Sequence, residues 1–163
     1  MTGPAITLAE ALAAAATGAP RRYVITGGPS SGKDDLIDAI LTAGIPCMEA
    51  EPGREIYRKH RMRLGRHLMR EDRREYSLEV LQAFVAEFTA HKQGIRFYNR
   101  GIPDGYGWES FFGLRPAPEL EEATRLYRYD AVFVLDPLDT FEDPDDIVWA
   151  KDSEIRRVHE LIV

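Results

Sequence analysis

Apolar residues follow two patterns along this chain: short runs, and longer stretches in which they recur every three or four positions. Short runs rich in β-branched and aromatic residues predict strands, and the second pattern predicts helices. The expected strands lie at residues 23–26, 45–49, 95–99 and 131–135. The expected helices of the main body lie at residues 36–41, 54–70, 77–93, 119–128 and 152–163. Strands that alternate with helices indicate an α/β fold of three layers with a parallel sheet.

The last expected strand differs from the others because it contains no polar residue. Residues 131–135 read Ala-Val-Phe-Val-Leu, a run that is typical of a parallel strand buried on both faces. The helix at residues 77–93 is instead predicted to be amphipathic, because its apolar residues from Leu78 to Phe88 recur at helical spacing.

The first 20 residues have a different composition from the rest of the chain, with a high content of alanine. Thr7 followed by Glu10 matches a capping box, so a helix is expected over residues 7–16. The start of the chain carries no positive charge and Glu10 interrupts the apolar run, which argues against a secretory signal. We expect residues 1–20 to form a helical extension and residues 21–163 to form one domain; no stretch approaches the 18 apolar residues of a membrane span.

Composition and charge narrow the possible functions. A net charge of −6 and a pI of about 5.3 argue against general affinity for nucleic acids. The single cysteine, Cys47, rules out an internal disulfide framework and is typical of a cytoplasmic protein. Because Cys47 lies in an apolar run, we expect a buried structural thiol.

The glycine-rich turn between the first strand and the next helix is the strongest functional signal. Residues 27–33 read GGPSSGK, with Gly27, Gly32 and Lys33 in the positions of a P-loop, the Walker A motif. In such a loop the backbone N–H groups surround a phosphate at a helix N-terminus, and the lysine reaches the outer phosphates. The residues expected to bind the phosphates of a nucleotide are Gly28, Pro29, Ser30, Ser31, Gly32, Lys33, Asp34 and Asp35.

Further motifs follow the loop in order: E-x-x-R-E at 51–55, RG-I-PD at 100–104 and YRYDAVFVL at 127–135. Together with the loop they resemble the small P-loop "AAA domain" ATP/GTP-binding proteins related to ribosylnicotinamide kinase and other nucleoside-kinase-like enzymes. The resemblance covers residues 21 to 162. It implies a P-loop NTPase fold of nucleoside-kinase type with strand order 2-3-1-4-5, a lid after the fourth strand, and ATP or GTP with Mg²⁺ as cofactor. The chain stops where the fifth strand of that family would begin.

The chain departs from the family pattern at three positions that handle metal and phosphate charge. The family has Ser or Thr where this chain has Asp34, and an acidic residue where this chain has Asn99. The family also carries a lid arginine. This chain has no arginine between Pro137 and Ser153; the one basic residue there is Lys151, and Trp149 lies near the position expected for the arginine.

Two interpretations of these departures remain open. In the first, Asp34 binds Mg²⁺ directly and Asn99 offers a neutral oxygen, so that the number of carboxylates is kept. In the second, Asp34 repels a triphosphate and nucleotide handling is lost. The first predicts a kinase- or ATPase-like protein with a remodelled metal site. The second predicts a degenerate P-loop protein, a pseudoenzyme, that uses the pocket for other acid–base chemistry or for partner binding, or whose Lys33 is simply neutralised by Asp34.

Either interpretation places charged residues at the carboxyl edge of the sheet, where doubly wound proteins bind ligands. The candidate catalytic residues are Lys33, Asp34, Glu51, Arg54, Asn99, Arg100 and Asp104. The candidate metal ligand is Asp34.

Three other features have functional and structural readings. The basic segment from Arg54 to Arg74 would clamp an anionic substrate or simply face water, and His60 and His67 within it are expected at the surface. Trp108 would stack on a substrate ring or pack under its loop. The missing fifth strand would leave an open sheet edge, which predicts a homodimer or a protein partner.

Overall fold

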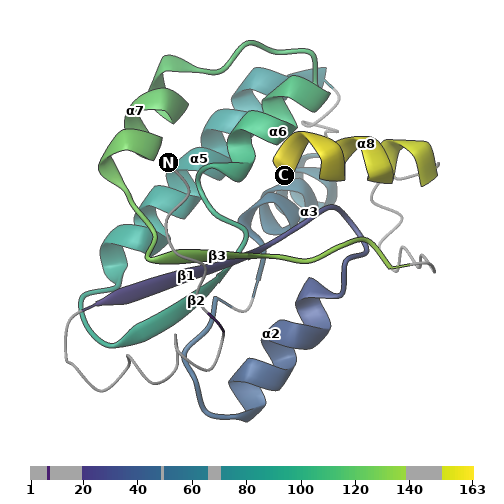
Figure 1. The fold of residues 1–163 in the computed structure, drawn as a ribbon. Coiled ribbons are helices and arrows are strands. Elements are labelled where there is room, and N and C mark those ends of the chain that lie inside the picture. The colour runs from purple at the N-terminus through teal and green to yellow at the C-terminus, as the bar shows by residue number, and fades with distance from the viewer. Residues whose placement is uncertain (1–6, 8–19, 49, 66–70, 139–151) are drawn as a thin grey trace.

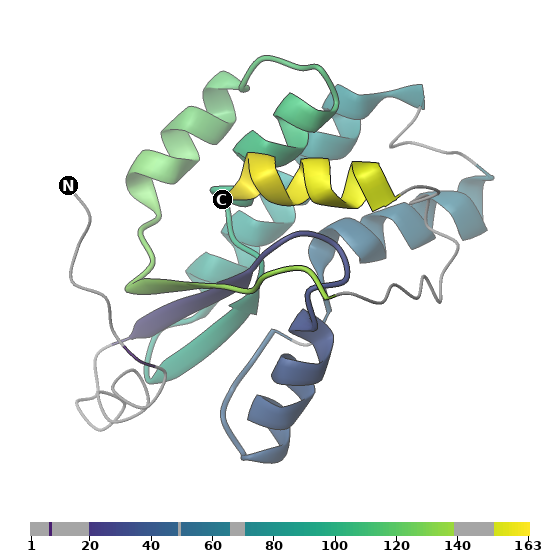
Figure 2. The same cartoon turned by 45° about the vertical axis from the view of Figure 1, so that its right-hand side comes forward.

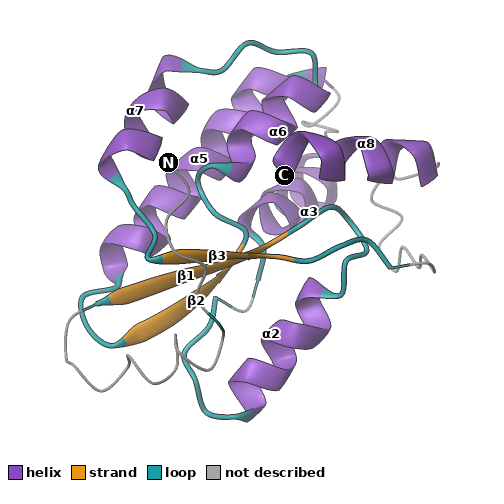
Figure 3. Ribbon diagram, in the orientation of Figure 1, coloured by secondary structure: helices purple, strands orange, loops and turns teal. Residues whose placement is uncertain are grey.

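The computed structural model describes residues 7, 20–48, 50–65, 71–138 and 152–163. Its sheet has three parallel strands in the order β2-β1-β3. The strands are β1 (Arg21–Thr26), β2 (Ile95–Asn99) and β3 (Ala131–Val134). Figures 1 and 3 show the sheet in the middle of the molecule, with helices above and below it. The three-layer α/β fold is confirmed.

One helix covers one face of the sheet and the remaining helices gather on the other (Figure 1). The first face is covered by α2 (Lys33–Thr42). The helices of the other side are α3 (Pro52–Leu64), α5 (Arg73–Ala90), α6 (Asp104–Phe111), α7 (Pro118–Leu126) and α8 (Asp152–Ile162). Side chains of β1 alternate between the two layers. Tyr23 and Ile25 pack toward α2, whereas Val24 joins a cluster with α5 and α7.

The expected strand at 45–49 is reduced to a single bridge. Cys47 pairs with Phe97 of β2, and the Met48 N–H donates to the Phe97 carbonyl at 2.8 Å. Pro46 has no N–H to donate, which limits the ladder that this segment can form. Its position beside β2 nevertheless gives the expected order 2-3-1-4, with residues 45–49 as the second element. Cys47 is buried and is not part of a disulfide, as expected.

Strand β3 contradicts the prediction of burial on both faces. Val132 and Val134 are 50% and 46% exposed, while Ala131 and Phe133 pack against the α2 side. β3 is an edge strand of the described sheet, and the other layer leaves these two valines uncovered. The apolar run at residues 131–135 therefore corresponds to a half-buried edge strand.

Helix α6 was not predicted from the sequence. Gly105 and Gly107 weaken its helical pattern, yet Gly107 is needed for packing, because a Cβ there would lie 2.8 Å from the Leu161 carbonyl oxygen. Figure 2 shows α8 lying across α6 and above the loop that follows β1. The C-terminal helix thus reaches the glycine-rich loop.

The helix expected at 7–16 lies almost wholly outside the described residues. Within the described residues, no helix is long and apolar enough to cross a bilayer.

Candidate functional site

The glycine-rich turn, residues 27–33, is called the phosphate loop below. Ser30 and Gly32 have φ values of 56° and 72°, so left-handed residues alternate with others and turn successive N–H groups toward one side. Gly27 has no room for a side chain, since a Cβ there would lie 2.3 Å from the Leu135 carbonyl oxygen. The loop leads into α2 at Gly32, an N-cap residue without a side chain to cap the first turn. These backbone features are those of an anion-binding loop at a helix N-terminus.

Lys33 is buried and bends back over the phosphate loop. Its Nζ donates to the Gly28 carbonyl at 2.6 Å and to Ser31 Oγ at 2.9 Å. Burial and, to a smaller extent, the nearby Arg100 guanidinium lower the pKa of Lys33 to about 7, against the opposing effect of the surrounding carboxylates. The loop therefore holds an amine whose protonated, cationic form would be stabilised by a bound anion.

Asp34 forms a separate group with two residues from other elements, called the metal corner below after the role that the sequence predicts for Asp34. Its Oδ2 accepts from Arg54 NH1 at 2.9 Å, and its Oδ1 accepts from Asn99 Nδ2 at 2.9 Å. Burial acts to raise the pKa of Asp34, but the Arg54 charge and the Asn99 hydrogen bond outweigh it and hold that pKa below its usual value. Asp34 is thus ionised and partnered.

These contacts bear on two expectations: a salt bridge between Lys33 and Asp34, and a neutral metal ligand from the Asn99 oxygen. Among the described residues Lys33 pairs with its own loop and Asp34 with Arg54 and Asn99, so Asp34 does not neutralise Lys33 by a direct salt bridge. Asn99 turns its amide nitrogen toward Asp34, while its Oδ1 is buried without a partner in the described part of the chain. In this conformation Asn99 contacts Asp34 through its amide nitrogen and not through its oxygen. Asp35 is exposed at the start of α2.

Arg100 holds the buried ion cluster, which we define as Arg100 with Glu51 and Asp104. Its Nε lies 3.0 Å from Glu51 Oε1, and its NH1 lies 3.5 Å from Asp104 Oδ1 and donates to the Gly27 carbonyl at 2.8 Å. Asp104 also accepts from the Gly101 N–H and from the Thr26 hydroxyl. Burial raises the pKa of Asp104 in spite of the Arg100 charge. Arg100 itself has a φ of 66°, an uncommon backbone conformation that is held by these contacts.

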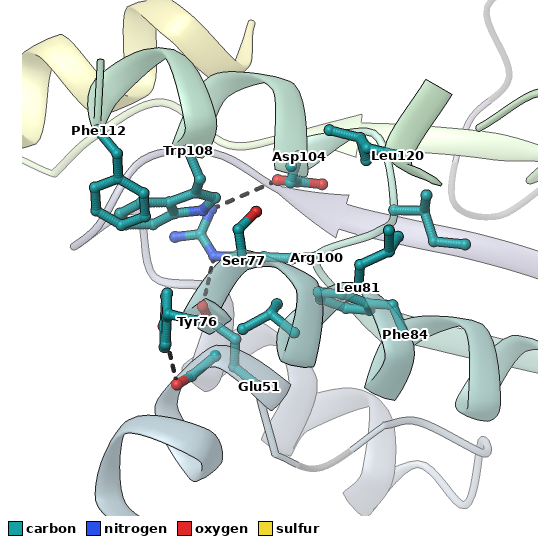
Figure 4. A pocket seen from close by; sticks show the side chains of 14 residues that line it. Glu51, Tyr76, Ser77, Leu81, Phe84, Arg100, Asp104, Trp108, Phe112 and Leu120 are labelled. Atoms are coloured by element: carbon teal, nitrogen blue, oxygen red, sulfur yellow. Dashed lines mark hydrogen bonds and ion pairs between the residues drawn. The ribbon is translucent and has the colours of Figure 1, made fainter. Parts of the chain in front are cut away.

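A pocket opens beside the buried ion cluster, between α5, α6 and the segment that begins α3 (Figure 4). Its empty volume, which includes a part open to solvent, is about 520 Å³. We call it the side pocket. Its lining residues are Glu51, Gly53, Tyr76, Ser77, Val80, Leu81, Phe84, Arg100, Ile102, Asp104, Gly105, Trp108, Phe112 and Leu120.

Sequence reasoning brought the charged end of the side pocket together correctly but missed its apolar wall. The helix predicted at residues 77–93 includes Val80 and Phe84 but begins after Tyr76, and only the fold shows that one stripe of α5 faces a cavity. Trp108 lines this pocket, with the Arg100 guanidinium carbon 5.3 Å from its ring centroid. Trp108 also packs on Phe112, so both expected roles remain open.

Helix α8 supplies a contact that no local sequence signal indicates. The Gly28 N–H donates to His159 Nδ1 at 3.1 Å, across 131 positions of the chain. A Cβ at Gly28 would lie 2.7 Å from the His159 Cβ. One amide of the phosphate loop is therefore already partnered within the protein.

The basic segment divides into parts with different roles. Arg54 belongs to the metal corner, and Arg74 donates to the buried carboxylate of Glu109 at 2.5 Å. His60 is buried rather than at the surface, with Nε2 3.0 Å from Glu79 Oε1, which corrects the expectation for this residue. His67 and the expected lid residues Trp149 and Lys151 lie outside the described residues.

The residues present fit a Mg²⁺ ion only as a partner of a bound nucleotide. Asp34 supplies one ionised carboxylate, and Mg²⁺ is commonly held by one or two carboxylates together with substrate phosphates. Within the described residues no cluster of three or more His, Cys, Asp or Glu side chains could bind a metal by itself.

Comparison with known proteins identifies the family. A family model described as an AAA domain matches residues 22–163. The chain belongs to this family. No curated protein matches the sequence of this AAA-domain protein.

Among solved structures, the fold of this AAA-domain protein is similar to that of NadR. The NadR complex with NR aligns with a TM-score of 0.58 at 16% identity, covering 88% of this chain and 41% of that chain. The NadR complex with NAD and AMP-PNP aligns with a TM-score of 0.58 at 15% identity, covering 88% and 40%. The chain thus spans about two fifths of the length of NadR, and the likeness is one of fold.

Proposed function

We propose that this protein binds a nucleoside triphosphate, ATP or GTP, at the phosphate loop and acts as a kinase- or ATPase-like phosphotransferase with a remodelled metal corner. The observation that carries the proposal is the backbone of the loop. Ser30 and Gly32 keep the left-handed conformations of an anion-binding loop, and the buried Lys33 amine lies on it. A loop of this kind at the start of a helix is built to surround phosphates.

The candidate residues divide naturally in this scheme. The backbone N–H groups of residues 28–35, apart from Pro29, which has none, and the Lys33 amine would hold the phosphates, and Asp34 would share a Mg²⁺ ion with them. That ion would neutralise charge on the phosphates as they transfer. Arg54 would either lose its contact with Asp34 or share the Asp34 carboxylate with the Mg²⁺ ion. Arg100, Glu51 and Asp104 would position the second substrate, and Asn99 would orient Asp34 through its amide.

The comparisons support this proposal at the level of fold and of what the relatives bind. One NadR structure holds NAD and AMP-PNP and another holds NR. AMP-PNP is an analogue of ATP, so a protein of this fold accepts a triphosphate. Because NadR is more than twice as long as this chain, its activity passes to this protein only as a hypothesis.

A specific observation favours the second interpretation, a degenerate P-loop protein. Asp34 already has two partners at 2.9 Å, and the Gly28 N–H is bonded to His159. A nucleotide must compete with these internal contacts. If it fails, the charged edge of the sheet remains as a site for other acid–base chemistry or for a protein partner.

Titration calorimetry with ATP and with GTP, each with and without Mg²⁺, tests the two interpretations. We expect Mg²⁺-dependent binding that weakens by roughly 10- to 150-fold in Lys33→Ala, because a charge-assisted hydrogen bond is worth about 1.5–3 kcal/mol. Lys92→Ala is the matched control, since Lys92 is exposed near the opposite end of β2, and we expect no change there. Folded wild-type protein that releases no heat with either nucleotide would contradict nucleotide binding. Tighter binding after Asp34→Thr with Asn99→Asp would indicate a site that has drifted away from nucleotides.

We also propose that a second copy or another protein covers the free edge of β3, in a cytoplasmic protein. The exposed Val132 and Val134 support a partner, because an uncovered apolar edge strand favours pairing with another chain. Sedimentation of the wild type and of Val132→Lys tests it. A monomer at all concentrations, with no partner recovered, would contradict it.

A further inference from the structure

One peptide group at the start of the phosphate loop is held at both of its ends. This group joins Gly27 to Gly28, so it consists of the Gly27 carbonyl and the Gly28 N–H. The carbonyl accepts from Arg100 NH1 at 2.8 Å, and the N–H donates to His159 Nδ1 at 3.1 Å. In a trans peptide the C=O and the N–H point in opposite directions. Arg100 and His159 therefore hold the peptide from opposite sides.

The two side chains that hold this peptide are fixed by the fold. Arg100 is 3% exposed and pairs with Glu51 and Asp104 of the buried ion cluster. His159 belongs to α8, which lies across α6 (Figure 2) and buries the neighbouring Val158 completely. Neither side chain is free to follow the peptide if the peptide turns. The Gly27–Gly28 peptide is therefore clamped between two well-packed parts of the molecule.

The phosphate loop and α8 meet closely at this point. Gly28 is buried, and a Cβ on it would lie 2.7 Å from His159 Cβ and 3.3 Å from the Ile155 carbonyl oxygen. A phosphate oxygen has no room between the Gly28 N–H and the backbone of α8. The Gly28 N–H is thus placed to hold the loop in position, and the later N–H groups of the loop are better placed to meet a ligand.

The contact also determines which nitrogen of the His159 ring carries the proton. A backbone N–H can only donate, so Nδ1 accepts and the neutral ring is protonated on Nε2. Nε2 lies 3.8 Å from Asp136 Oδ1, and a carboxylate at this distance favours the same tautomer. A proton on Nδ1 would place two donors opposite each other and remove the contact.

Gly28 connects the clamped peptide to Lys33. Lys33 Nζ donates to the Gly28 carbonyl at 2.6 Å, and Ser31 Oγ donates to the same carbonyl at 3.0 Å. The Gly28 N–H and carbonyl flank a single Cα, so fixing the N–H limits the directions in which the carbonyl can point. His159 therefore acts on the position of the Lys33 amine through the backbone of the loop.

We propose that His159 is a positioning residue of the phosphate loop, which clamps the Gly27–Gly28 peptide together with Arg100 and keeps the loop in the form that accepts phosphates. The proposal deepens the proposed function and rests on it for the nature of the ligand. It also narrows the set of phosphate ligands: the Gly28 N–H stays with His159, and the N–H groups that follow it meet the phosphates. A loop that already has its binding form loses less affinity to rearrangement.

The opposite role would be a contact that competes with the nucleotide. If the Gly28 N–H had to leave His159 before phosphate could bind, removal of the imidazole would strengthen binding. If His159 positions the loop, removal of the imidazole weakens binding, because the loop then also populates forms that do not bind. The two roles therefore predict changes of opposite sign.

The first measurement needs no ligand and uses the full chain at about pH 8, where an ordinary histidine is neutral. NMR of the ring nitrogens should show His159 unprotonated on Nδ1 and protonated on Nε2. His159→Asn identifies the signal and keeps an acceptor, Oδ1, near the position of Nδ1. The Gly28 amide should exchange its proton slowly in these two proteins and at least about tenfold faster in His159→Leu, which has no acceptor. A proton on Nδ1 in the wild type, or equal exchange in all three proteins, would overturn the proposal.

The second measurement is calorimetry with AMP-PNP and excess Mg²⁺. We expect His159→Leu to bind about fivefold more weakly than the wild type and His159→Asn to bind within about twofold of it. Ser153→Leu, which adds a leucine at an exposed position of α8, is the matched control and should leave the affinity unchanged. His159→Ala replaces His159→Leu if that variant does not fold.

Unchanged or tighter binding in folded His159→Leu, or equally weak binding in His159→Asn, would overturn the positioning role. A wild type that binds no AMP-PNP would be a failure of the proposed function. The ring tautomer and the Gly28 exchange rate still decide in that case whether the clamp exists, so the two failures are distinguishable.

Discussion

The phosphate loop and the metal corner lie side by side, but the chain builds them in different ways. The phosphate loop is built by the backbone. Its left-handed residues Ser30 and Gly32 orient backbone N–H groups toward one side, and the Lys33 amine donates to a carbonyl of the same loop. The metal corner is made of three side chains from separate elements, Asp34, Arg54 and Asn99. Backbone geometry survives a change of side chains, whereas a corner made of side chains changes its chemistry with each substitution.

This difference explains how a chain can keep the lysine of the Walker A pattern and differ from that pattern at the next residue. Lys33 keeps its expected environment, while Asp34, the next residue, has recruited Arg54 and Asn99 as partners. Anion binding is therefore expected to be the more robust property. The use of a metal ion is expected to be the more sensitive one.

The largest effect is expected at Arg100, which joins the phosphate loop to the buried ion cluster. Arg100→Met leaves Glu51 and Asp104 without their cation and should lower the free energy of unfolding by about 3–5 kcal/mol. Urea denaturation measures it. Arg21→Met is the control, because its pair with Asp130 is partly exposed and its loss should cost much less than that of Arg100. Equal losses in the two variants would show that the cluster does not support the site.

Because the pKa of Lys33 is lowered, the pH dependence of stability and the proton uptake on ligand binding both report on the loop. The Lys33 pKa of about 7 lies below the ordinary 10.5, so between these values the unfolded chain holds the proton and the folded chain does not. Stability should therefore rise with pH in that window. A bound triphosphate restores the charge, so binding at about pH 8.5 should take up close to one proton, falling toward zero below about pH 6.

Calorimetry in buffers of different ionisation enthalpy counts these protons. Lys33→Arg keeps the positive charge without titrating, and its binding should take up none. The same proton uptake in both proteins would assign it to another group.

Asp34→Asn tests the metal corner with a side chain of the same shape. Removing the charge should strengthen Mg²⁺-free nucleotide binding by about 1 kcal/mol, or roughly fivefold. It should also abolish the gain that Mg²⁺ gives the wild type, because the proposed ligand is lost. Calorimetry with and without Mg²⁺ measures both effects. A Mg²⁺ gain that persists in the variant would remove Asp34 from the metal site.

Arg54→Gln should have the smallest effect on stability, below about 1 kcal/mol, because the ion pair with Asp34 is largely solvent-exposed. It should instead raise the pKa of Asp34 toward its usual value. Because that pKa is lowered in the folded protein, the contribution of Asp34 to stability is lost only as the pH falls below its ordinary range. Carboxyl NMR titration of Asp34 measures the change; an unmoved titration would mean that Asn99 alone sets it.

The fold could be predicted largely from local patterns. The apolar run at Ile95–Asn99 matches β2 to the residue, and the loop at 27–33 leads into α2 as expected. The two elements that were predicted wrongly or missed also have local causes. Pro46 reduces a strand to one bridge, and Gly105 with Gly107 conceals α6.

The candidate site was harder to predict because its details depend on contacts between distant segments. The sequence indicates which residues reach the edge of the sheet, and the structure does bring Asp34, Arg54 and Asn99 together. Which of them pair cannot be read from spacing. The contact between Gly28 and His159, and the apolar wall of the side pocket, arise only once helices α5 and α8 are packed.

A crystal structure grown with excess Mg²⁺ and AMP-PNP tests the central claim most directly, because it reports on the loop itself. We expect phosphate oxygens within hydrogen-bonding distance of Lys33 Nζ and of the backbone N–H groups that begin α2, with Asp34 released from Arg54 toward the metal. A well-ordered loop in which Lys33 Nζ still lies on the Gly28 carbonyl and Ser31 Oγ, with no ligand present, would contradict the claim that this loop binds nucleotides.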